Sequence, residues 1–204
     1  MFAVVESGSI TSMPRGNKGV KIGDYNYPPT VFTLWSESER NAVGIYTVEI
    51  DNTNKKADEW YINTEITYAF GSGKVTGTYG TATAKAHADT LYTEQNKTDG
   101  EIPADKDVGD VRYEGLKTIL IRNVKSQAEG ILNKTDWYVT RKAEKSTAIP
   151  SAITTHRDAV RTKQASMETA ITNAADTAAL QTLYTYTTTD GVTSRPLGEL
   201  PTLS

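Results

Sequence analysis

The two histidines, His87 and His156, are the side chains best suited to bind a metal or to move a proton at neutral pH. They stand far apart in the sequence, and neither has a second potential ligand at helical spacing. The chain has no cysteine, so disulfides, thiolate nucleophiles and cysteine-based zinc sites are excluded. The sequence therefore predicts no metal, no cofactor and no catalytic histidine.

The other polar clusters fit structural roles better than catalytic ones. Paired carboxylates occur in turn-like or linker sequence, where solvated charge is expected, namely Asp58-Glu59 and Asp105 with Asp107. The glycine-rich segment 71–74 superficially resembles a phosphate-binding loop, but Tyr68 stands where its first glycine belongs and Val75 where serine or threonine must follow. No GxSxG, HExxH, GxGxxG or EF-hand motif is present. We therefore expect a protein that is not an enzyme and has no catalytic residues.

The richest cluster of side chains lies in residues 135–161, where two expected helices meet at a proline. Its candidates for a helix junction or an interface are Trp137, Tyr138, Arg141, Arg157 and Arg161. In one interpretation the tryptophan fills the helical core, and one of the last two arginines pairs with Asp136 or Glu144 to fix the junction. In the other, the cluster forms a protein interface, because tryptophan, tyrosine and arginine are enriched at binding hot spots. The sequence leaves both open, and both can hold on different faces.

The composition is that of a polar but foldable chain. Hydrophobic residues make up 37% and charged residues 23% of its 204 residues, enough for one sizeable core or two small ones. A net charge of −3 gives no basic footprint for nucleic acid. No segment approaches the roughly 18 apolar residues of a membrane span, and the first residues lack a basic signal region. We expect a soluble protein made in a cytoplasm, with no nucleic-acid or membrane partner.

Residues 1–93 are expected to form a small β-rich domain, with hairpins and one short helix. One hairpin turns at Ser7-Gly8-Ser9 and another, within residues 59–79, turns at the glycine-rich segment. A capping box at residues 36–39 predicts a helix of about two turns that ends at Gly44. In the strand that follows, alternation predicts a buried face, made by Tyr46, Val48 and Ile50. Residues 81–93 are compatible with a helix.

The rest of the chain reads as a linker, 94–109, a helical domain, 110–185, and a tail, 186–204. Apolar spacings of three and four predict a helix of about 25 residues from Asp110 onward. A shorter helix is expected from a cap at Thr135 or Asp136, then one at 151–172 with an apolar seam, and a last one at 177–184. The tail contains Asp190-Gly191, a favoured hairpin turn, before an extended end that should dock on the bundle or on another chain. The expected fold class is α+β, with a three-to-four-helix bundle.

The cluster also follows a known sequence pattern. The matching residues are Ile131-Leu132, Thr135-Asp136-Trp137, Arg141, Glu144, Ile149-Pro150 and His156-Arg157-x-x-Val160-Arg161. This pattern resembles the C-terminal domain of a poorly characterised bacteriophage tail and tail-fibre-associated family. That family typically has an aromatic residue at the position of His156 and leucine at that of Val160. The N-terminal half is also similar, through Tyr27-Pro28-Pro29 and Gly44-Ile45-Tyr46-x-Val48, so the resemblance covers about residues 1–52 and 116–172.

The resemblance implies a non-enzymatic structural protein of the virion tail, made in the host cytoplasm. Its partners would be other tail or fibre proteins, with repeated copies or a homo-oligomer on a symmetric tail. Some members of the family look like fibre-assembly chaperones, so a cytosolic chaperone that is not retained in the virion is the alternative. The resemblance brings no catalytic residue.

Overall fold

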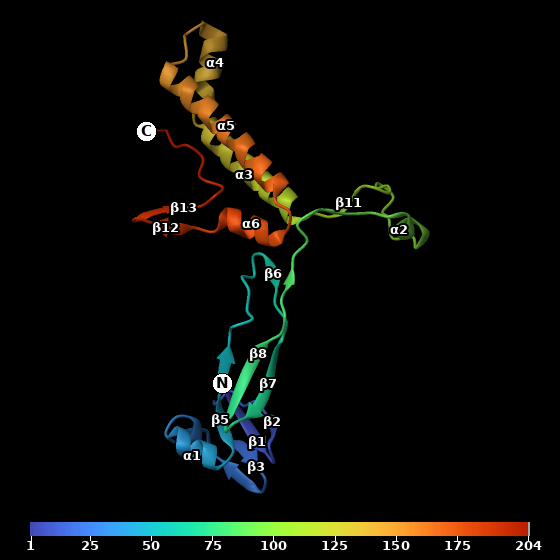
Figure 1. The fold of residues 1–204 in the computed structure, drawn as a ribbon, viewed down its shortest axis with the longest axis vertical. Helices are drawn as coiled ribbons and strands as arrows, with labels where there is room; N and C mark the ends of the chain where they lie inside the picture. The colour runs from blue at the N-terminus through green and yellow to red at the C-terminus, as the bar shows by residue number, and fades with distance from the viewer. Residues whose placement is uncertain (204) are drawn as a thin grey trace. The chain divides into compact units, whose positions relative to one another are not determined.

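The computed structural model describes residues 1–203 and has an α+β fold (Figure 1). The chain divides into two compact units: a sheet unit, Met1–Thr83, and a helical unit, Ala84–Ser204. This order of a β-rich part before a helical part agrees with the prediction. The division itself differs, because residues 84–109 belong to the helical unit instead of completing the first domain and forming a linker.

A five-stranded sheet is the frame of the sheet unit. Its order is β2 (Ser9–Ser12), β1 (Phe2–Glu6), β5 (Ile45–Asp51), β8 (Lys74–Tyr79) and β7 (Ile66–Gly71). Only β5 and β8 run parallel among these neighbours. The two predicted hairpins are confirmed, with Ser7-Gly8 and Ser72-Gly73 at positive φ in the turns, as tight turns between twisted strands require. The glycine-rich segment is thus a hairpin turn.

The core of the sheet unit lies on both faces of the sheet. Ala3, Val5 and Val75 are buried on one face, against the half-buried Tyr46 and Val48. The other face carries a cluster of Val31, Phe32 and Ile45. The prediction for β5 was therefore wrong at two positions: Ile45 is fully buried, because the second face is also covered, and Ile50 is 40% exposed.

Short elements complete the sheet unit. Strands β3 (Val20–Ile22) and β4 (Tyr25–Tyr27) form a hairpin, and a 3-10 helix spans Pro29–Phe32. Helix α1 (Glu37–Ala42) begins at the predicted capping box and is followed by Gly44 at a φ of 84°. The predicted hairpin within residues 59–79 is shorter than expected, because β6 (Tyr61–Ile62) pairs instead with β9 (Thr83–Ala84).

The segment expected to be a linker is a loop between two paired strands. Strand β10 (Thr90–Leu91) is antiparallel to β11 (Val111–Tyr113), and helix α2 (Glu94–Thr98) lies in the connection. This pairing also corrects the start of the first long helix: residues 111–113 are extended, and helix α3 spans Leu116–Asn133. The Asp89 carboxylate accepts from the Gly115 N–H at 2.6 Å and from the Thr118 hydroxyl at 2.9 Å, which fixes that start.

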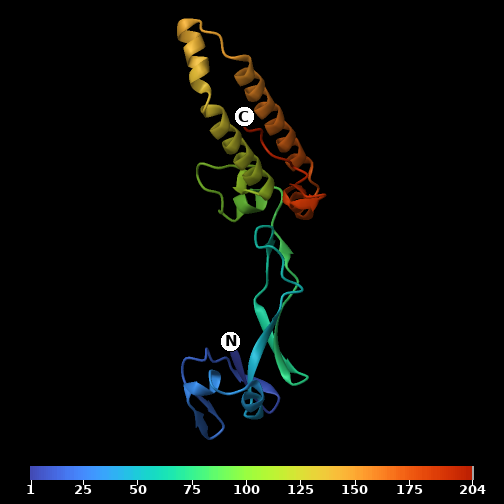
Figure 2. The same cartoon turned by 90° about the vertical axis from the view of Figure 1, so that its left-hand side faces the viewer.

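Helices α3 and α5 (Ser151–Asn173) lie side by side as an antiparallel pair (Figure 2). The predicted seam of α5 is confirmed, since its apolar members are buried: Ile153, Val160, Met167 and Ile171. Arg157 is buried in the same seam. Helix α4 (Asp136–Lys145) connects the pair, and α6 (Thr177–Tyr184) is capped by Asp176, which accepts from the Ala179 N–H at 2.8 Å.

The tail docks on the helical unit. Strands β12 (Thr187–Thr189) and β13 (Val192–Ser194) form the predicted hairpin around Asp190-Gly191, both at positive φ. Leu197 is 2% exposed, its N–H donates to the Leu183 carbonyl at 3.0 Å, and its carbonyl accepts from the Lys163 ammonium at 2.8 Å. One buried leucine and two hydrogen bonds thus hold the extended segment after the hairpin. Among the helices of residues 1–203, none has the length and apolar composition that a membrane crossing needs.

Candidate protein interface and its helix junction

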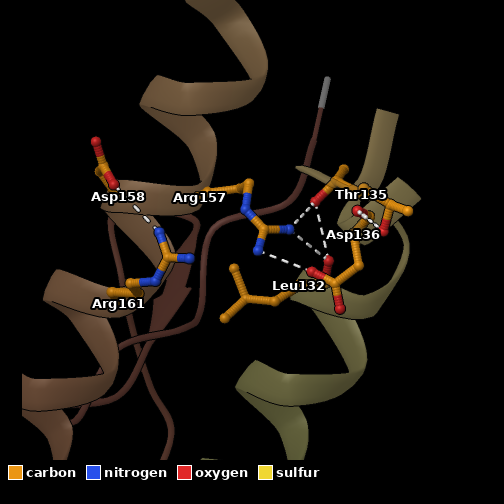
Figure 3. Close-up of polar contacts among 7 residues, drawn as sticks. Leu132, Thr135, Asp136, Arg157, Asp158 and Arg161 are labelled. Carbon is orange, nitrogen blue, oxygen red and sulfur yellow. Dashed lines mark hydrogen bonds and ion pairs between the residues drawn. The ribbon is translucent and has the colours of Figure 1, made fainter. Parts of the chain in front are cut away.

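A buried arginine fixes the junction between α3, α4 and α5 (Figure 3). One guanidinium nitrogen of Arg157, Nη1, donates to the Leu132 carbonyl at 2.8 Å and to the Thr135 hydroxyl at 2.6 Å. The other, Nη2, lies 2.8 Å from the Asp136 carboxylate. Only 8% of Arg157 is exposed, whereas the Asp136 side chain is 51% exposed. One side chain of α5 therefore holds both the end of α3 and the beginning of α4.

Thr135 takes a different role from the cap that was predicted. It stands at the N-cap position of α4, but its side chain makes no capping hydrogen bond. Its hydroxyl donates to the Leu132 carbonyl at 2.9 Å while it accepts from Arg157. Because Thr135 is 4% exposed, these bonds satisfy a buried hydroxyl in the centre of the junction.

The two arginines proposed for the junction are not equivalent. Arg157 pairs with Asp136, as one interpretation of the sequence required. Arg161 instead pairs with Asp158 on its own helix at 3.2 Å, and its side chain is 51% exposed (Figure 3). Within residues 1–203 neither arginine forms an ion pair with Glu144. Arg161 therefore lies outside the junction, and the two residues differ because only position 157 falls on the buried seam of α5.

Trp137 is not a core residue, which corrects the other half of that interpretation. Half of it, 50%, is exposed. Its ring stacks on that of Tyr138, with centroids 3.7 Å apart and planes at 30°. The Arg141 guanidinium carbon lies 4.8 Å from the Trp137 ring centroid and 5.1 Å from that of Tyr138. Trp137, Tyr138 and Arg141 thus form one surface group, called the aromatic triad below.

The rest of α4 is equally open to solvent. None of its ten residues is buried. At 100° per residue, the triad shares an arc of about 140° with two lysines, Lys142 and Lys145. Asp136 is turned to Arg157, so the arc is basic, and Arg141 has no carboxylate partner within residues 1–203. The Arg141 Nε is itself buried without a hydrogen-bond partner in that part of the chain. Such a surface offers aromatic area and unpaired positive charge to a partner.

The histidines stay apart, and the described residues contain no group of three or more potential metal ligands. His156 is half-buried and lines a cavity of about 340 Å³ with Ile131, Thr135 and Leu203. Sequence reasoning missed this cavity, because it forms where the tail meets the α3–α5 pair. The cavity adjoins the junction. Among the described residues that line it, His156 and Lys134 are the titratable ones.

Shifted pKa values belong to exposed pairs away from the interface. A hydrogen bond from Arg122 lowers the pKa of Glu114 below its ordinary range. A hydrogen bond to Glu199 raises the pKa of the Tyr186 hydroxyl. Each pair joins exposed side chains from two segments of the helical unit, and Arg195 also pairs with Glu199.

In comparisons with known proteins, no family, no curated protein and no solved structure matches the chain.

Proposed function

We propose that this protein is a non-enzymatic structural protein of a phage virion, a tail or tail-fibre-associated adaptor whose contact surface is α4. The observation that carries the binding role is the aromatic triad, in which a half-exposed tryptophan is stacked on a tyrosine beneath an unpaired arginine. These are the residue types that dominate hot spots at protein interfaces. The phage context rests on the resemblance of residues 131–161 to tail-associated proteins.

The position of α4 supports a role in binding. A helix of ten residues is too short to be stable in water without tertiary contacts. Since no residue of α4 is buried, the core of the helical unit contributes little to its stability, and the junction at Arg157 holds its first turn. A partner that covers the aromatic triad would bury the apolar area that the chain itself leaves open.

Mass spectrometry of purified virions tests the proposal. We expect the protein in several copies per particle. Particles made with Trp137→Ala should lack it, whereas Tyr25→Ala, a change at an aromatic residue that is 72% exposed in the sheet unit, should leave incorporation unchanged. Because Trp137 is half exposed, its loss should change the free energy of unfolding by only about 1 kcal/mol, mainly through the lost ring and cation contacts.

Two results would contradict the proposal. Absence from particles, despite abundance in the lysate of infected cells, would exclude the virion role and favour an assembly chaperone. Normal incorporation of the Trp137→Ala protein would show that α4 is not the contact surface.

A further inference from the structure

The helical unit carries two complementary surfaces at opposite ends of α3. The aromatic triad follows the end of α3, whereas the loop 94–110, with α2, precedes its beginning (Figures 1 and 2). The 18 residues of α3 make a rod of about 27 Å at 1.5 Å per residue. The two surfaces of one chain are therefore too far apart to touch, and any contact between them must join different copies.

The loop 94–110 has an open hollow on its surface. Its cavity of about 170 Å³ is lined in part by aliphatic side chains, those of Ile102, Pro103, Ala104 and Val108. Two lysines, Lys97 and Lys106, border the same hollow, together with Asp107.

The hollow is built into an ordered loop. The Tyr92 N–H donates to the Asp110 carbonyl and the Gly109 N–H donates to the Tyr92 carbonyl, each at 2.9 Å. Arg112, in β11, also pairs with the Glu101 carboxylate of the loop at 3.0 Å. The loop is thus held at both ends, so little conformational entropy is lost when a side chain enters it.

The charges of the two surfaces are opposite. Residues 94–110 contain six carboxylates and two lysines, a net charge of −4. Residues 134–145 contain three lysines and one arginine against two carboxylates, a net charge of +2, although the whole chain is at −3. The Asp105 and Asp107 carboxylates have no basic partner within residues 1–203, as is also true of Arg141. Unpaired charges of opposite sign thus flank an exposed ring on one surface and a partly aliphatic hollow on the other.

We propose that the partner of α4 is the loop 94–110 of a second copy of this chain. The Trp137 ring enters the hollow, and Arg141 with Lys142 faces Asp105 and Asp107. This inference rests on the proposed function, since it names the partner of the same surface. The contact is head-to-tail, because different surfaces of the two copies meet, and such contacts build rings when the rotation closes and filaments when it does not.

Mixing of two variants of the full chain tests this geometry. R141E/K142E removes the basic surface, and D105K/D107K removes the acidic one. The wild type should self-associate in sedimentation experiments, and each variant alone should be monomeric. An equimolar mixture should regain association, because the intact α4 of one variant meets the intact loop of the other, and the reversed α4, now acidic, faces the reversed loop, now basic. Lys18→Glu and Glu129→Lys, charge reversals at exposed positions outside both surfaces, should associate as the wild type does.

The outcomes separate this inference from the proposed function. If the wild type is monomeric at every concentration, or if the mixture does not associate, the second copy is not the partner. The proposed function would still stand if Trp137→Ala prevented incorporation into virions. If R141E/K142E still self-associates, the contact lies elsewhere. If a single-stranded oligonucleotide binds the wild type but not this variant, α4 is a nucleic-acid surface. Association should also weaken at ~0.5 M salt, where exposed charges are screened over a few ångströms.

Discussion

Replacing Arg157 by methionine should destabilise the helical unit by about 2 kcal/mol. The substitution keeps an unbranched apolar stem on the seam of α5 but removes the three polar contacts at the junction. The groups left behind are not stranded. The Leu132 carbonyl still accepts from the N–H and hydroxyl of Thr135, and the half-exposed Asp136 carboxylate can be solvated. The lost stability is therefore the net contribution of hydrogen bonds made by a charged group. It does not include the larger penalty of leaving a buried polar group without a partner.

A double-mutant cycle isolates the ion pair within that loss. Asp136→Ala removes the carboxylate and leaves the Arg157 cation buried, and it also loses a favourable charge in the first turn of α4. The interaction of the Asp136 charge with the N-terminus of α4 is the same with or without the arginine, so its free energy cancels in the cycle. We expect a coupling free energy of about 1 kcal/mol between the two positions, because residues in direct contact couple by roughly 0.5–3 kcal/mol.

Urea unfolding followed by far-ultraviolet circular dichroism measures these differences, since the long helices belong to the helical unit. The matched control is Arg161→Met, the same change four residues along α5, where an exposed pair with Asp158 should contribute less than about 0.5 kcal/mol. Equal losses for the two methionine variants, or a coupling below about 0.3 kcal/mol, would refute the role assigned to the junction.

Two further predictions concern the sheet unit. Gly77→Ala should destabilise it by about 1–3 kcal/mol, because a Cβ there would lie 2.8 Å from the Tyr68 ring and 2.9 Å from two isoleucine side chains; an unchanged urea midpoint would show that these side chains move freely. The Ser36 hydroxyl and N–H hold the pKa of Glu39 below its ordinary 4.5, so this stabilisation is complete above that pH and is lost as the pH falls through the lower folded pKa. In Ser36→Ala the Glu39 pKa, measured by NMR titration, should move back up toward 4.5; a value that stays as low as in the wild type would contradict the capping box as its cause.

The features that sequence predicted well are those set by neighbouring residues. The capping box at Ser36 and Glu39, the turn at Asp190-Gly191 and the break at Pro150 each depend on the conformational preferences of one to four consecutive residues. The apolar seam of α5 was also predicted, because a periodic pattern over many residues indicates a helix face even when single positions depart from it. These turns, the cap at Ser36 and helix α5 were therefore expected at nearly their observed places.

The misses all involve partners distant in the sequence. Val111 fits the apolar spacing of α3, but pairing with Leu91 makes it extended, and the same pairing turns the expected linker into a loop. Ile50 alternates correctly along β5, yet nothing covers it fully. Tryptophan is a residue type that is usually well buried. Trp137 is nevertheless half exposed, because α4, which carries it, extends beyond the α3–α5 core. Burial depends on which elements meet, and no local pattern contains that information.

A polar junction suits the binding role that we propose for α4. Apolar contacts at the base of α4 would hold it without fixing its direction, because hydrophobic attraction is non-directional. Arg157 instead holds three acceptors, on Leu132, Thr135 and Asp136, whose positions its planar guanidinium restricts. The acceptors belong to the last turn of α3 and the first of α4, so the bonds set the angle between the two helices. Trp137 is the next residue after the last of these acceptors, and the direction of the aromatic triad is therefore determined by the buried arginine.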